Sequence, residues 1–340
     1  MTDRFSPKTY ALFILALLLT MLLCVCVGSV SIAPKDTLTA VFCALMEKEV
    51  PAGISKNIIL NVRLPRVLNV ALVGAALSLC GAAMQGLLRN PLADGSTLGV
   101  SSGASLGAVI ALALGVTVPG SEYGGTMIMA MAFAFLSLVL ILSLAYALDH
   151  SLATNSIILI GVIFSMFVSS VINLILSFLN NRVRSVAFWT MGSLSGTGYA
   201  HTRILALALL LCGGVIFRYA RELNAFAVGE DNARHIGVNV KRVKLVILVT
   251  VSVLIGVCVS IGGSIGFVGL VVPHMARMIA GPNHKRLLPA SMFAGAIFLL
   301  LADLIARTLL SPVELSIGVV TSLVGAAAFV VIFYRARKAG

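Results

Sequence analysis

The sequence predicts an all-α, polytopic membrane protein that has about ten transmembrane helices. Of its 340 residues, 59% are hydrophobic and only 11% are charged, whereas a soluble domain carries about 25% charged residues. The mean hydropathy is +1.08, and apolar runs of about 17–25 residues, the length that crosses a bilayer, recur along the chain. We therefore expect residues 1–340 to form a single transmembrane domain.

Each predicted helix is an apolar run between polar or glycine-rich segments. The first run is too long for the apolar core of a cleavable signal peptide, so we expect it to be retained as a helix. The eighth is the least regular, because it is short and is interrupted by glycine and by Pro273. The ten runs lie near residues 10–30, 67–88, 98–118, 125–148, 156–179, 203–219, 243–262, 264–280, 288–306 and 316–334.

The basic residues indicate how the helices are oriented. The net charge is +12, but the Lys and Arg residues are scattered at the ends of apolar runs, as the positive-inside rule describes. This scatter argues against nucleic-acid binding. If the N-terminus is inside and the spans alternate, the inner segments hold most of the 24 basic residues, which predicts that both termini are cytoplasmic.

Two inner loops carry most of the polar sequence between spans. The longer, residues 218–244, contains "GEDNARHIGV", which predicts a short helix that ends at Gly237. Glu230 and Asp231 fall in its first turn, where the helix dipole favours acidic side chains. The second loop is residues 277–289. Both loops are either solvated connectors or docking surfaces, and the helical order of the first favours a docking surface.

The chemistry that the sequence lacks limits the function. It has no GxxxxGK[ST] segment, so it cannot bind ATP as P-loop proteins do. The glycines of "GSIGFVG" (263–269) lack the strand and helix of a nucleotide-binding fingerprint and indicate a turn or a close-packing site. Few ionisable residues lie in the middle of the spans, where ion-coupled carriers bind their ions. A transporter of this kind must take its energy from a partner.

The sequence also indicates no metal site and no catalytic centre. The six cysteines lie mostly within apolar runs without a CxxC pair, as small helix-packing residues do. His274, His284, Asp303 and Glu314 are metal-ligand types, but their spacing does not converge on one helix face and they fall on both sides of the membrane. No nucleophile is paired with a base, so we expect no enzyme activity in this chain.

A glycine ladder marks one helix as closely packed. Gly99, Gly103 and Gly107 are spaced four residues apart and share one helix face. Glycine at such positions lets another backbone approach. We expect this ladder to pack the third span tightly beside the Asn90-Pro91-Leu92 turn.

Several long segments resemble one family of transporters. They are "RLPR" (63–66), "GAALSLCGAAMQGLLRNPLADGSTLGVSSGA" (74–104), "WTMGSL" (189–194), "VGEDNARHIGVNV" (228–240), "GSIGFVGLVVPHMARMIAGPNHKRLLP" (263–289) and "ADLIARTLLSPVELSIGVVTSLVGA" (302–326). These segments closely resemble the permease subunits of ABC importers for iron chelates, haem and vitamin B12, which have the type II importer permease fold. The resemblance runs from about residue 10 to 335. Gly95, Ser316 and Ala327 stand where the family often has proline.

The resemblance implies a set of partners that agrees with the missing energy site. In the family, two permeases form a dimer around the translocation path, so a second copy or a paralogue of this chain is expected. Two ATPase subunits, which carry the ATP and Mg²⁺, lie on the cytoplasmic side, and an extracytoplasmic binding protein delivers the cargo. The chain itself would bind no cofactor, and it would lie in the bilayer of a bacterial or archaeal cytoplasmic membrane.

The resemblance also assigns residues to both ends of the helices. At the outer end, Arg63, Arg66 and Arg307 would pair with acidic residues of the binding protein; interfacial arginines that reach the lipid headgroups are the alternative. At the inner end, a gate would form where the turn at Asn90, Pro91 and Leu92 faces the turn before the fifth span, which contains Leu152 and Thr154. Asn90 and Thr154 otherwise only stabilise a turn and cap a helix.

The resemblance places the contact with the ATPase on the inner loops. The residues involved would be Gly229, Glu230, Ala233, Arg234 and Gly237, with His274 and Arg277 in the second loop. A ferric siderophore is the cargo we favour, and haem, cobalamin and oxyanions remain open. An ion-driven carrier, an intramembrane enzyme and an assembly factor are the alternatives from other classes.

Overall fold

Helices account for all the regular secondary structure elements that the described residues form. The structure, a computed structural model, describes residues 5–30, 32–49, 51, 53–119, 124–150, 154–178 and 183–338, so the predicted gate residue Leu152 lies outside the described residues. The elements are α1 (Pro7–Cys26), α2 (Pro34–Leu45), η1 (Ile58–Arg63), α3 (Leu64–Leu88), η2 (Gly95–Leu98), α4 (Val100–Leu114), α5 (Gly124–Leu148), α6 (Thr154–Phe178), α7 (Val183–Thr190), α8 (Tyr199–Arg218), α9 (Ala220–Val228), α10 (Glu230–His235), α11 (Val240–Gly262), α12 (Val268–Ala280), α13 (His284–Thr308) and α14 (Ile317–Lys338).

The ten predicted spans all coincide with apolar helices. Seven helices are long and apolar enough to cross a membrane: α1, α3 with η1, α5, α6, α8, α11 and α13. The other three predicted spans correspond to the shorter apolar helices α4, α12 and α14. The hydropathy pattern did not predict α2 and α7, which are short helices outside the ten spans.

Helix α3 forms the centre of the bundle because its small residues let neighbouring backbones approach. A Cβ added at Gly81 would lie 1.8 Å from the carbonyl oxygen of Gly269 on α12, and one added at Gly74 would lie 2.3 Å from that of Gly295 on α13. Contacts this close require that Gly81 and Gly74 carry no Cβ. Accordingly, 89% of the most apolar part of α3 is buried inside the protein.

The glycine ladder packs α4 against α5. A Cβ at Gly103 would lie 2.3 Å from Ser137 Oγ, and one at Gly107 would lie 2.3 Å from the carbonyl oxygen of Met129. Gly99 precedes α4 and has a φ of 71°, in the left-handed region that glycine adopts readily. The structure therefore places the ladder in a helix–helix contact, with its first residue at the turn that starts α4.

Helix α12 is shorter than the predicted span at 264–280. Gly263 and Phe267 have φ values of 69° and 67°, and these left-handed residues interrupt the chain before α12 begins at Val268. Pro273 lies inside α12 and does not end it. The irregular sequence here therefore marks a turn followed by a half-length helix.

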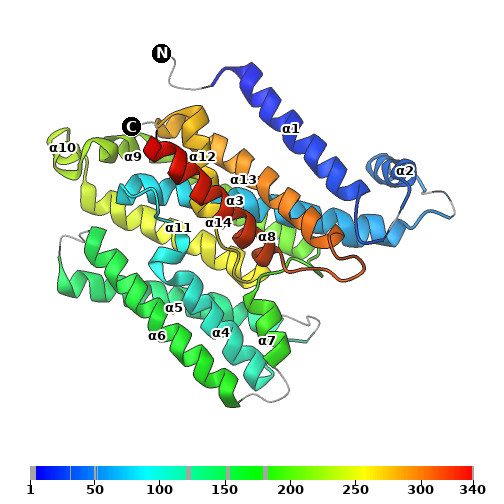
Figure 1. Cartoon of the computed structure of the whole chain (residues 1–340), viewed down its shortest axis with the longest axis horizontal. Helices are drawn as coiled ribbons and strands as arrows, with labels where there is room; N and C mark the ends of the chain where they lie inside the picture. The colour runs from blue at the N-terminus through cyan, green and yellow to red at the C-terminus, as the bar shows by residue number, and fades with distance from the viewer. Residues whose placement is uncertain are drawn as a thin grey trace.

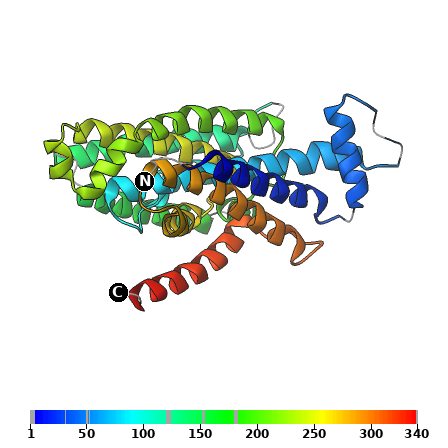
Figure 2. The same ribbon diagram turned by 90° about the horizontal axis from the view of Figure 1, so that it is seen from above.

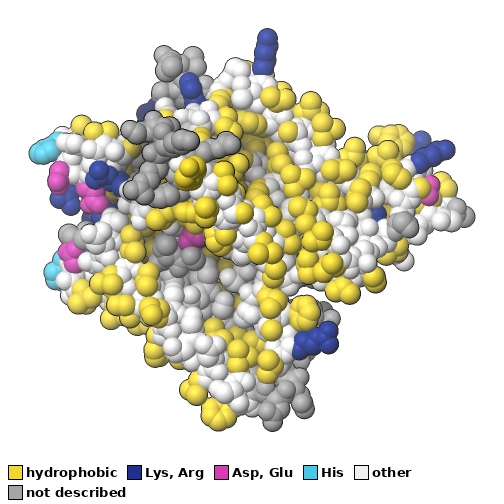
Figure 3. Space-filling model, viewed as in Figure 1, with side chains coloured by type: hydrophobic (Ala, Val, Ile, Leu, Met, Phe, Trp, Pro, Cys, Tyr) yellow, Lys and Arg dark blue, Asp and Glu magenta, His cyan; other side chains and the backbone are white. Residues whose placement is uncertain are grey.

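The two ends of the bundle differ in composition from its middle. Figure 3 shows hydrophobic side chains over the middle of the visible face, with most of the charged side chains near α9–α10 and near α2. The start of α1 and the end of α14 lie at the same end as α10, and α2 lies at the opposite end (Figures 1 and 2). This agrees with the predicted orientation, in which both termini share the side of the long inner loop. We call the α10 end the inner end and the α2 end the outer end.

Candidate functional site

Arg66 lies at the centre of a buried ion-pair cluster at the outer end. Its Nε and Nη2 donate to Asp303 Oδ1 at 3.1 and 2.9 Å, and its Nη1 donates to Glu314 Oε2 at 2.8 Å. Asp303 Oδ2 also lies 2.9 Å from Arg307 Nε, one helical turn along α13. The cluster of Arg66, Asp303, Arg307 and Glu314 therefore ties α3 to α13 and to the segment that follows α13.

Arg307 and Arg63 bind the carbonyls at the C-terminal end of α1. Arg307 Nη2 donates to the carbonyl of Cys24 at 3.1 Å. Arg63 Nη1 donates to the carbonyls of Val25 and Cys26 at 3.1 and 3.2 Å, and its Nη2 donates to that of Val30. The last carbonyls of a helix have no partner within the helix and carry partial negative charge. The two guanidinium groups supply both the missing donors and the complementary charge.

These contacts give the three arginines partners within the chain itself. Arg63, Arg66 and Arg307 were predicted to present their charge to a binding protein, but the structure buries all three side chains. They do lie at the outer end, as the orientation requires. In this conformation, however, their donors face carboxylates and carbonyls of the same chain, because a charge at the edge of the apolar core must be paired.

Glu314 is the partly exposed member of the cluster, and its titration gives a testable pH dependence. Its burial alone would raise the pKa of Glu314, but the hydrogen bond and charge of Arg66, with Ser29 and Arg307, hold this pKa below the usual value of 4.5. A carboxylate with a depressed folded-state pKa stabilises the fold above the unfolded pKa, and that contribution is lost as the pH falls.

We expect Glu314→Gln to remove part of the acid sensitivity of this protein. The wild type should lose stability as the pH falls below about 4.5 through the lower, folded-state pKa of Glu314, and the variant should lose less over the same interval. Thermal unfolding midpoints from pH 7 down to pH 3 measure the difference. Identical pH profiles for the two proteins would show that Glu314 does not stabilise the fold through its charge.

At the inner end, the predicted gate turn has its own hydrogen bonds. Helix α3 ends at Leu88, and Arg89 follows with a φ of 52°. Asn90 Oδ1 accepts from the Leu92 amide at 2.9 Å, and the Asn90 carbonyl accepts from the Ala93 amide at 3.0 Å. Pro91 and Leu92 are exposed at the tip. The turn-stabilising role of Asn90 is therefore present, and the turn offers an apolar tip at the inner surface.

The predicted ATPase-contact segment forms a compact unit around α10. Gly229 and Gly237 lie on either side of the helix with φ values of 126° and 87°, in a region that L side chains rarely adopt. Ala233 is fully buried, whereas Arg234 is exposed and pairs with Asp231 at 3.3 Å. Glu230 turns toward the bundle, where Lys244 Nζ lies 2.7 Å from its Oε1. The short helix was predicted correctly from its acidic start and glycine end.

Exposed apolar side chains lie near the inner end. Val228 and Ile236, which precede and follow α10, are 69% and 71% exposed, and Ile279 near the end of α12 is 87% exposed. His274 and Arg277 lie on the same helix as Ile279 and are partly buried. Large apolar groups in polar loops are typical of protein–protein contacts. Sequence reasoning named the polar residues here and missed these apolar ones.

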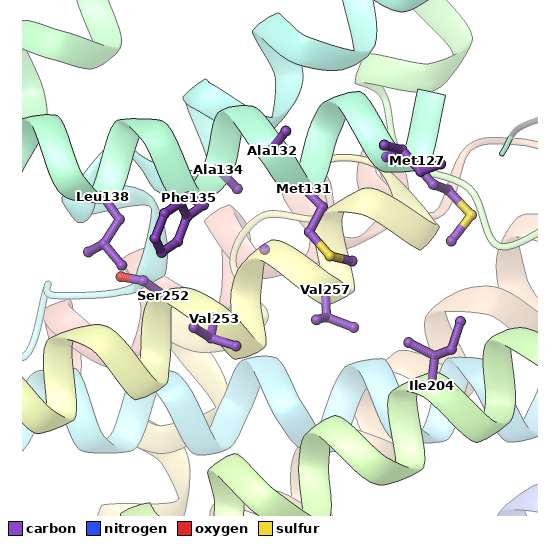
Figure 4. Close-up of a pocket in the computed structure, with 12 residues that line it drawn as sticks. Met127, Met131, Ala132, Ala134, Phe135, Leu138, Ile204, Ser252, Val253 and Val257 are labelled. Atoms are coloured by element: carbon purple, nitrogen blue, oxygen red, sulfur yellow. The ribbon is translucent and has the colours of Figure 1, made fainter. Parts of the chain in front are cut away.

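Two cavities open along α5. A groove of about 590 Å³ lies between α5 and α8 with α11 as its floor, and Figure 4 shows Met131, Phe135 and Leu138 of α5 above Val253 and Val257 of α11. Its lining is apolar apart from Ser252 and offers no group that binds a charged chelate. The second cavity, about 860 Å³, lies at the outer end and includes Arg184 and His201.

The four residues of metal-ligand type separate in the structure. Asp303 and Glu314 share Arg66 at the outer end, whereas His284 starts α13 at the inner end and bonds Asn224 through Nδ1 at 2.8 Å. Among the described residues, no three His, Cys, Asp or Glu side chains gather closely enough to hold a metal ion.

The sequence matches the model of the FecCD transport family over residues 16–335. This chain belongs to the FecCD transport family. It is 37% identical to the vitamin B12 import system permease protein of Klebsiella pneumoniae, over 96% of this chain and 93% of that protein. It is 36% identical to the hemin transport system permease protein of Yersinia pestis, over 83% of this chain and 84% of that protein. An uncharacterized ABC transporter permease protein of Bacillus subtilis is 44% identical, over 84% of this chain and 80% of that protein.

The fold agrees with that of a solved permease. A solved inward-facing structure described as a metal-chelate type ABC transporter superposes with a TM-score of 0.84 at 30% identity, over 97% of this chain and 100% of that chain. The family and this likeness confirm the predicted type II ABC importer permease fold. The FecCD-family chain is thus a multi-pass membrane permease of the ABC importer type, and its named relatives are permease subunits.

Proposed function

We propose that this FecCD-family permease carries a ferric siderophore or a similar metal chelate across the cytoplasmic membrane, driven by ATP hydrolysis on two partner ATPase subunits. The surface around α10 at the inner end is the observation that supports ATPase subunits as the energy source. Val228 and Ile236 are exposed beside α10, whose glycine-bounded fold holds it as a unit. An apolar surface rimmed by charged groups suits a protein partner better than a solvated connector.

The path would lie between two permease copies. Helix α14 leans away from the rest of the bundle (Figure 2), and Leu323 and Val330 on it are 69% and 67% exposed. Helix α6 is likewise mostly exposed, with 22% of its apolar window buried. Apolar surfaces of this kind face either lipid or protein, and we propose that a second copy or a paralogue packs on these two and closes the pathway. The turn at Asn90–Leu92 and the start of α6 near Thr154 would then form the inner gate.

The binding protein would dock at the outer end, near the arginine cluster. Glu314 is 29% exposed in its side chain, so it is the carboxylate that an incoming acidic residue can replace on Arg66. Docking through Arg63, Arg66 and Arg307 would therefore require an exchange of carboxylates rather than contact with free guanidinium groups.

The cargo class rests on the family and on the named relatives. These relatives import vitamin B12, hemin and, for a 33% identical Haemophilus influenzae protein, molybdate. The solved structural neighbour described as metal-chelate type favours a chelate. Cobalamin, haem and oxyanions stay as alternatives, because the named relatives carry cargoes of all these kinds.

Purification of this subunit from its host tests the partners and the cargo together. We expect mass spectrometry to find a P-loop ATPase in about equal amount after solubilisation in a mild detergent, and a binding protein in the nucleotide-free complex. Titration of that binding protein with a ferric siderophore, haem, cobalamin and molybdate then identifies its cargo. Recovery of no ATPase in several detergents would contradict the proposal.

A further inference from the structure

We propose that Glu230 is a positioning residue that fastens α10 to the inner ends of α6 and α11. Displacement of α10 by a partner would then move the start of α6. This inference rests on the proposed function in one respect: the partner that would displace α10 is the ATPase. We call Glu230, Lys244 and Thr154 the Glu230 clamp.

The clamp joins three separate elements through one carboxylate oxygen. Glu230 is the first residue of α10, Lys244 lies in the second turn of α11, and Thr154 is the first described residue of α6. Glu230 Oε1 lies 2.7 Å from Lys244 Nζ and accepts a hydrogen bond from Thr154 Oγ1 at 3.2 Å. Figure 1 shows α10 at the same end of the bundle as the starts of α6 and α11. The carboxylate therefore bridges elements that are far apart in the sequence.

The ion pair between Glu230 and Lys244 is much more buried than the pair between Asp231 and Arg234 on the same helix. The Lys244 side chain is fully buried, and Glu230 is 25% exposed. Separation of a buried ammonium from a carboxylate removes a favourable interaction that water does not replace. Asp231, the next residue, is 87% exposed and pairs along its own helix with Arg234, and such surface pairs contribute little. Glu230 thus links α10 to α6 and α11, whereas Asp231 pairs within α10.

Arg89, which directly precedes the predicted gate turn at Asn90–Leu92, also lies near the start of α10. A Cβ added at Gly229 would lie 3.9 Å from Arg89 Nη1, and Arg89 ends α3 immediately before the Asn90–Leu92 turn. The Arg89 side chain and Thr154, at the start of α6, therefore both lie beside the start of α10. The Gly229 and Ala233 carbonyls accept from the Ala233 and Val238 amides at 2.9 Å each, and these two hydrogen bonds join α10 to the residues on either side of it.

Hydrogen exchange on the full-length chain in lipid nanodiscs tests the clamp without any partner. We expect Glu230→Gln to increase deuterium uptake by peptides covering the start of α6 about ten-fold, because opening of this end no longer breaks a buried ion pair. Lys244→Met should act on the same peptides, and the double variant should be far from additive. Thr154→Val, which changes no charge and preserves side-chain volume, should give a smaller increase of roughly three-fold.

Asp231→Asn is the matched control, because it removes the same charge from the next residue of the same helix. It should leave the exchange of α6 unchanged. The inference is overturned if Glu230→Gln and Thr154→Val both leave α6 exchange at the wild-type rate, or if Asp231→Asn has an equal effect. Thr154→Val keeps the test decisive where the charge variants fold poorly.

The complex with its co-purified ATPase separates this inference from the proposed function. ATP with vanadate should change α6 exchange in the wild-type complex, and this response should be lost in the Glu230→Gln complex. An equal response in both complexes overturns the clamp. A wild-type complex in which ATP with vanadate leaves the hydrogen exchange of α6 unchanged contradicts the proposed function. The clamp is then judged on the hydrogen exchange of the isolated chain.

Discussion

Asp303→Asn is expected to lower the free energy of unfolding by about 3–5 kcal/mol, because it leaves two buried guanidinium groups without their shared carboxylate. Asp303 Oδ1 accepts from Arg66, and its Oδ2 lies 2.9 Å from Arg307 Nε. The loss should also free the end of α1, since Arg307 holds the Cys24 carbonyl. Thermal unfolding in detergent, followed by size-exclusion chromatography, should show a midpoint lower by about 5–10 °C.

Glu49→Gln is the control for this prediction. Glu49 is an exposed carboxylate at the same outer end, and its removal should shift the midpoint by less than about 1 °C, as surface substitutions do. An Asp303→Asn protein as stable as the Glu49→Gln protein would show that the arginine cluster does not hold the outer end together.

Gly81→Ala is expected to be at least as damaging, although it adds a single methyl group. Its Cβ would lie 1.8 Å from the Gly269 carbonyl oxygen and 2.5 Å from the Gly269 carbonyl carbon, so the backbones of α3 and α12 must separate. Overpacking of this kind costs about 3 kcal/mol at the upper end of its usual range, and here the obstacle is backbone rather than a flexible side chain. The yield of monodisperse protein and its unfolding midpoint measure the effect.

Gly214→Ala provides a matched control within another span. Nothing lies within 4 Å of a Cβ added at Gly214 on α8, so the same substitution there should be neutral or should stabilise the helix by up to about 1 kcal/mol. Equal losses at Gly81 and Gly214 would contradict the close α3–α12 contact and would indicate a general intolerance of substitution in the spans.

The sequence predicted the elements better than their contacts. Hydropathy located all ten spans, because an uninterrupted apolar run of spanning length has few other interpretations. Local chemistry located α10, whose acidic start and terminal glycine act over a few residues. The start of α12 was placed too early, because hydropathy does not register the left-handed backbone at Gly263 and Phe267.

The arginine cluster shows where sequence reasoning fails. Asp303 and Arg307 are four residues apart on one helix, a spacing that indicates a pair. Arg66 and Glu314 are separated by 248 residues, and no local rule brings them together. The family resemblance grouped the three arginines at one end of the helices, but their burial depends on which helices surround α3. The same applies to Thr154, whose bond to Glu230 spans 76 residues.

We propose that ATP hydrolysis on partner subunits drives transport through this permease. Its most direct test is uptake by proteoliposomes that contain the purified complex, with ATP inside, the binding protein outside and an iron-55 ferric siderophore as cargo, beside haem, cobalamin and molybdate in parallel. The account predicts that uptake requires ATP and the binding protein and persists when ionophores collapse the proton and sodium gradients. Uptake that continues without ATP and stops with the ion gradient would contradict it.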